Sequence, residues 1–188
     1  INKPYATIQK AYDSANTTAT IKIMNDLNIS SSINFNASKT ITLTSYSTTG
    51  AVNTAKKAKA VNSVLLTVSA GALNLYNIVI DGNGIADPGG LIEITNDASF
   101  SANNGVTIKN AVSTYLYGGA IRSAGYKRPI VIDGATFINN KAPGGGAILS
   151  TNLTLKSGTV SNNTSTNGTG GGIYICGNLT INGGSINE

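Results

Sequence analysis

Carboxylates are the side chains of this sequence best suited to act on a sugar or to bind a cation. Glycosidic hydrolysis uses two carboxylates at a defined separation, and lyase chemistry uses a carboxylate-held cation beside a base. The 188-residue chain contains no histidine and eight acidic residues. They are Asp13, Asp26, Asp81, Asp87, Glu93, Asp97, Asp133 and Glu188. This thin distribution offers no convincing catalytic constellation, so we expect no enzymatic activity from this chain.

Asp81 and Asp133 are each the fourth residue of a sequence IVIDG, which raises the question of whether they stack on one face. Ile80 lies 12 residues before Ile92, whereas Ile132 lies 16 before Ile148. The unequal offsets predict that the two aspartates occupy different strands. Asp133-Gly134 is typical of a turn at a strand end.

The loop DGNGIAD places Asp81, Asn83 and Asp87 at alternating positions, as in a calcium-binding loop. It lacks the terminal bidentate glutamate of such loops. Calcium is therefore the one cofactor to consider, and these three residues are its candidate ligands. The lone Cys176 lies in an apolar run and is expected to be structural filler at a buried position of a strand.

Apolar residues that follow glycine clusters recur at a steady period. The anchors are Leu66, Ile92, Ile121, Ile148 and Ile173. By subtraction, the successive spacings are 26, 29, 27 and 25 residues. A period this regular is typical of a solenoid.

Each period contains three short alternating runs rich in β-branched residues and bounded by Gly, Asn, Asp or Ser. Three short strands per coil, with no room for a helix, predict a parallel β-helix whose strands stack about 4.8 Å apart. We expect one all-β domain over residues 1–188.

The N-terminal part is expected to cap the solenoid and to form its first coils. Residues 4–15 place Tyr5, Ile8, Tyr12 and Ala15 at helical spacing, which predicts a short helix capping the first coil. Residues 20–46 form the first coils, 47–63 are a loop insertion, and 64–188 are the regular coils.

Asparagines and glycines mark the corners between coils. Glycine permits a positive φ or close backbone approach, and asparagine tolerates the left-handed region while its amide can bond to an amide one coil away. The predicted corner residues are Asn139, Asn140, Gly144, Gly145, Gly146, Asn162 and Asn163.

FINNKAPGGGAI, residues 137–148, resembles the F-x-x-N and G-G-A-I repeats of polymorphic outer-membrane adhesins and related bacterial and archaeal surface proteins. GGAI at 118–121 and the N-terminal PYATIQKAYDSA are similar to that family too. The resemblance implies a right-handed β-helix of pectate-lyase-like architecture, secreted or attached to the cell surface as a piece of a longer adhesin.

Binding function on a repeat scaffold is expected in its loops. STYLYGG and SAGYKRPI combine aromatic rings with cations, which suits stacking on sugars and holding acidic glycans. The candidate ligand-binding residues are Tyr115, Tyr117, Arg122, Tyr126, Lys127 and Arg128. The alternative is that the tyrosines pack on a neighbouring coil and the cations are solvated, as for the lysines of TAKKAKA at 54–60.

The remaining partner predictions follow from charge and hydropathy. The net charge is +5, but the basic residues are scattered, so we expect no nucleic-acid partner. No apolar run is long enough to span a membrane, and an uncapped last coil predicts edge-to-edge self-association.

The main functional prediction is an adhesin-like binding or spacer module that recognises a glycan or a host protein. The alternatives are a carbohydrate-active enzyme with catalytic residues elsewhere and a purely structural stalk.

Overall fold

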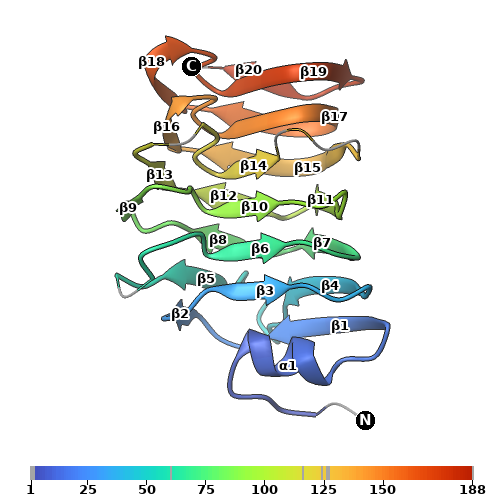
Figure 1. Ribbon diagram of the computed structural model, residues 1–188. Helices are drawn as coiled ribbons and strands as arrows, with labels where there is room; N and C mark the ends of the chain where they lie inside the picture. Colours follow the sequence, from blue (N-terminus) through green and yellow to red (C-terminus); the bar gives the residue numbers. More distant parts are fainter. Residues whose placement is uncertain (1–2, 60, 116, 124, 126–127, 188) are drawn as a thin grey trace.

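The computed structural model describes residues 3–59, 61–115, 117–123, 125 and 128–187. These form a parallel β-helix of about six turns, as predicted (Figure 1). The front strands run from left to right while the chain climbs from its N-terminus to its C-terminus, which makes the coil right-handed (Figure 1).

Three faces run along the axis, named here in the order in which the chain visits them. Face 1 contains β3 (Ile33–Phe35), β6 (Leu66–Val68), β10 (Ile92–Ile94), β14 (Ile121–Ser123) and the first parts of β17 (Ile148–Ser161) and β19 (Ile173–Ile181). Face 2 contains β1 (Thr18–Ile23), β4 (Thr40–Ser45), β7 (Ala72–Tyr76), β11 (Ser99–Asn103), the start of β15 (Ile130–Ile138), the middle of β17 and the end of β19.

Face 3 contains β2 (Leu27–Ile29), β5 (Thr54–Lys57), β8 (Val79–Asp81), β12 (Thr107–Lys109), the ends of β15 and β17, and β20 (Ser185–Asn187). A fourth, shorter sheet closes the corner between faces 3 and 1. Its strands are β9 (Ala86–Asp87), β13 (Val112–Ser113), β16 (Lys141–Gly144) and β18 (Thr164–Thr169). This fourth sheet adds to the three strands per coil that the sequence predicts.

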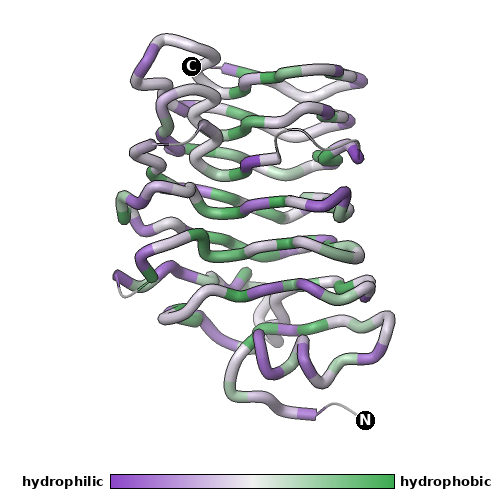
Figure 2. The backbone as a smooth tube through the Cα atoms, viewed as in Figure 1, coloured by the Kyte–Doolittle hydropathy of each residue, from purple (hydrophilic) through white to green (hydrophobic). Residues whose placement is uncertain are grey.

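The five periodic anchors form one ladder on face 1. Leu66 pairs with Ile92, Ile92 with Ile121, Ile121 with Ile148, and Ile148 with Ile173. The apolar core therefore extends along the axis, and Figure 2 shows hydrophobic residues in every coil.

Helix α1 (Ile8–Ser14) covers the first coil, as expected (Figure 1). It begins at Ile8 rather than after Pro4, because the Thr7 hydroxyl accepts the N–H of Lys10 as an N-cap. Ile8 and Tyr12 are buried, and the Tyr12 ring meets Phe35 edge-on at 5.0 Å. Tyr5 lies before the helix and is exposed, contrary to the prediction.

The interpretation of 47–63 as a loop insertion is wrong for residues 54–57. They form β5, which pairs with β2 and β8 in face 3. Ala55 and Lys57 point into the core, because strand residues two apart share a face. The alanine–lysine composition hid this strand, since neither residue is typical of strands.

The asparagine and glycine corners are confirmed. In each asparagine pair the first residue adopts a positive φ, and the second is buried and bonds to an adjacent coil. Asn139 and Asn162 have φ of 57° and 52°. Asn140 and Asn163 are buried, and Asn140 Nδ2 donates to Asn163 Oδ1 at 3.0 Å in the next coil. Gly144 ends β16, and Gly145 to Ala147 form the bend into face 1, with Gly145 at φ 55°.

Candidate functional site

Those predicted binding residues that the structure describes do not form one site. Tyr115 and Tyr117 precede the three-residue strand β14, whereas Arg128 follows it, so they lie at opposite ends of that strand. Tyr126 and Lys127 lie outside the described residues.

The two described tyrosines have different surroundings. Tyr115 is 79% exposed. The Tyr117 ring meets Tyr174, which lies two coils further along the axis, edge-on at 5.3 Å and is half-buried. Packing between coils therefore accounts for Tyr117, which is the alternative that the sequence left open.

Arg122 points outward from β14 on face 1. Its guanidinium donates to the Glu93 carboxylate of β10, with which it is in register. The positive charge is therefore neutralised within the protein, so Arg122 offers little attraction to an anionic ligand.

Arg128 borders a hollow of about 260 Å³ on face 2. Its NH1 group donates to Ser99 Oγ at 3.1 Å, and among the described residues no carboxylate pairs with it. Asn74, Ser101 and Val131 line the same hollow, and Ser101 Oγ donates to Asn74 Oδ1 at 2.7 Å. The hollow thus combines an exposed cation with hydroxyl and amide groups.

A column of small side chains continues from this hollow along face 2, and we call it the polar ladder. Its members are in register from coil to coil, and none is buried. They are Thr20, Thr42, Asn74, Ser101, Val131, Thr154 and Thr180. Sequence reasoning missed the ladder, although a polar residue between two apolar ones recurs in every face 2 strand except β15 and could have revealed it.

The candidate calcium ligands are held by hydrogen-bond donors. Asp81 Oδ1 accepts the Asn83 N–H at 2.7 Å and Asn110 Nδ2 at 3.1 Å. Asp87 contacts the ammonium of Lys57 through Oδ2. Because Lys57 already provides the positive charge beside Asp87, the geometry does not favour a calcium site. The described residues contain no group of three potential metal-ligating side chains.

The two aspartates of the IVIDG sequences lie far apart along the chain and on different parts of the coil. Asp81 ends β8 on face 3 and is 3.7 Å from Lys109 Nζ. Asp133 lies where β15 passes from face 2 to face 3 and is 3.7 Å from Lys156 Nζ. The prediction that Asp81 and Asp133 occupy different strands is confirmed.

Cys176 is exposed, so its expected burial is wrong.

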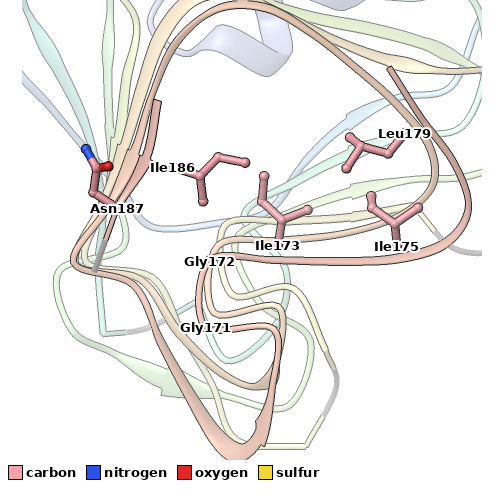
Figure 3. A pocket seen from close by; sticks show the side chains of 7 residues that line it. All are labelled: Gly171, Gly172, Ile173, Ile175, Leu179, Ile186 and Asn187. Carbon is pink, nitrogen blue, oxygen red and sulfur yellow. The ribbon is translucent and has the colours of Figure 1, made fainter. Parts of the chain in front are cut away.

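The C-terminal coil ends in an open apolar hollow of about 470 Å³. Ile173, Ile175, Leu179 and Ile186 point into it, as Figure 3 shows. In the described part of the chain, β18, β19 and β20 each pair with a strand on one side only. Their other edges therefore offer unpaired backbone groups.

We expect the 188-residue protein to associate through this edge with a second copy. Because α1 covers the opposite end, the contact should join two C-terminal coils. Size-exclusion chromatography with light scattering should show a mass that rises with concentration. Changing both Ile181 and Ile186 to lysine should leave a monomer, whereas Val52→Lys, which alters another exposed apolar residue, should not. A wild-type monomer at every concentration would contradict the expectation.

Comparisons with protein-family models, curated proteins and solved structures found no match to this chain. No helix among the described residues is long and apolar enough to cross a membrane. The features that bear on function are therefore the hollow beside Arg128 and the sequence resemblance.

Proposed function

We propose that this protein is an adhesin-like module of the cell surface that binds an acidic glycan on face 2. The hollow beside Arg128 carries this proposal. The location outside the cell comes from the resemblance of the FINN and GGAI repeats to surface adhesins.

Arg128 supplies the charge for such a ligand. A planar guanidinium can donate two parallel hydrogen bonds to a carboxylate or sulphate. Arg122 is bound to Glu93, whereas Arg128 bonds to the neutral Ser99, so its charge is available. Uronate or sulphated sugars are therefore the ligands that the hollow fits best.

The polar ladder supplies contacts for a long ligand. Its side chains repeat at the strand spacing of about 4.8 Å. A sugar chain lying parallel to the axis would meet a hydroxyl or amide at nearly every coil, with Val131 providing an apolar contact. A linear polysaccharide is favoured over a short oligosaccharide because it would use several coils at once.

Binding to immobilised acidic and neutral polysaccharides tests the proposal. Arg128→Ala should weaken binding of acidic polysaccharides about tenfold or more, since hydrogen bonds to charged groups contribute about 1.5–3 kcal/mol. Arg122→Ala is the matched control and should leave binding unchanged. Equal losses in the two variants would contradict the assignment of the site.

The alternative functions give different results in the same assay. A structural stalk would bind none of the polysaccharides, in wild type or variant. A carbohydrate-active enzyme would release reducing ends or unsaturated uronates from acidic polysaccharides, whereas we expect no release.

A further inference from the structure

Lys57 and Asp87 form a contact between successive coils inside the protein. Lys57 ends β5 and Asp87 ends β9, at the left edge of neighbouring coils in Figure 1. Their side chains are 1% and 2% exposed, and Lys57 Nζ donates to Asp87 Oδ2. Ala55 and Val61 nearby in the sequence are also buried, and a Val64 methyl group packs near Gly89.

The second oxygen of Asp87 is held by backbone donors. Oδ1 accepts the N–H of Gly89 at 2.7 Å and that of Gly90 at 2.9 Å. Two N–H groups aimed at one carboxyl oxygen form the arrangement that stabilises an oxyanion in acyl transfer. The carboxyl carbon is thus polarised on one side while the lysine nitrogen approaches the other oxygen.

Burial favours the uncharged amine of the lysine in such a pair. Two charges removed from water lose their hydration, and the loss can exceed their mutual attraction. Desolvation lowers the pKa of Lys57 from 10.5 to about 8. A larger share of Lys57 is therefore the nucleophilic amine than for a solvated lysine.

We propose that Lys57 and Asp87 condense into an intramolecular isopeptide bond. A proton passes from the Lys57 ammonium to Asp87 Oδ2, which gives an amine and a carboxylic acid. The amine nitrogen attacks Cγ, and the N–H groups of Gly89 and Gly90 hold the negative charge on Oδ1. Nζ gives up a second proton to Oδ2, the Cγ–Oδ2 bond breaks, and one water leaves while the Nζ–Cγ amide forms.

The other lysine–aspartate pairs show why this one is singled out. Lys109–Asp81 and Lys156–Asp133 have N–O distances of 3.7 Å, and their lysine side chains are 36% and 51% exposed. Water reaches these two lysine side chains, whereas it is excluded from Lys57. An amide at Lys57–Asp87 would join two successive coils covalently and remove both buried charges.

Mass spectrometry tests the proposal directly. The intact protein should be lighter than its sequence by one water. A tryptic digest should contain a branched peptide joining Lys57 to Asp87, and cleavage after Lys57 should be lost because its side chain is acylated. Fragmentation of the branched peptide should place the link at Asp87 and leave Asp81 unmodified, and cleavage after Lys109 and Lys156 should proceed normally, which provides an internal control. An intact wild-type mass equal to that of the sequence would overturn the proposal.

A succinimide at Asp81-Gly82 or Asp133-Gly134 would lose the same mass and must be distinguished. Hydroxylamine cleaves a succinimide but leaves an isopeptide intact, so the mass deficit should survive this treatment. Lys57→Arg, which keeps the charge but lacks an amine nucleophile, should restore the full mass. The wild-type digest decides the matter even if that variant fails to fold, because loss of water without the branched peptide would also overturn the bond.

Discussion

Replacing Gly145 with alanine is expected to lower the free energy of unfolding by about 3 kcal/mol or more. Gly145 has a φ of 55°, and an added Cβ would lie 2.3 Å from the carbonyl oxygen of Ile148. That oxygen belongs to the backbone of β17 and cannot move away without displacing the strand. Urea unfolding followed by circular dichroism measures the loss.

Gly168→Ala is the matched control for this prediction. Gly168 also has a positive φ, 76°, but a Cβ there would meet nothing within 4 Å. Its substitution adds only the cost of a left-handed alanine, about 1 kcal/mol. Equal effects at the two positions would show that backbone conformation alone, and not the close approach to Ile148, makes glycine necessary at this corner.

Replacing Asn140 with alanine should cost about 3 kcal/mol of unfolding free energy. Asn140 Oδ1 accepts the N–H of Ala111, and Nδ2 donates to the carbonyl oxygen of Ile108 and to Asn163 Oδ1. The variant leaves buried polar groups of the two flanking coils without these partners, and each such group costs about 1–3 kcal/mol. The measurement is again the unfolding midpoint in urea at unchanged slope.

Asn178→Ala provides the comparison for the asparagine ladder. Asn178 Nδ2 donates to Asn152 Oδ1 at 3.1 Å, so this pair also joins two coils, but at an exposed position. Water can replace the lost bond, and the expected change is within about 0.5 kcal/mol. A loss at Asn140 as small as that at Asn178 would contradict the structural role of the buried ladder.

These corners also bear on the proposed binding function. Gly145 and Asn140 lie at the corner between faces 3 and 1, away from the hollow beside Arg128 on face 2. A corner variant that still folds should therefore keep its affinity for acidic polysaccharide, whereas Arg128→Ala should lose affinity while keeping its stability.

The sequence by itself determined the solenoid and its register. Leu66, Ile92 and Ile121 follow corners of one type and meet in one ladder, because a repeated local pattern places the same residue at the same point of each coil. The left-handed asparagines and the capping helix were predictable for a similar reason. Turn conformation and helical periodicity depend on residues near in sequence.

Only the tertiary structure decided which charged and polar groups meet. Lys57 was expected in a solvated loop, yet it is buried against Asp87, 30 residues later in the sequence. Arg122 and Arg128 look alike in sequence. Among the residues that the structure describes, Arg122 pairs with the carboxylate of Glu93, whereas no carboxylate pairs with Arg128. Such contacts depend on which side chains of neighbouring coils come to lie opposite each other. The segments between the anchors differ in length, so the period of the anchors alone does not predict these pairings.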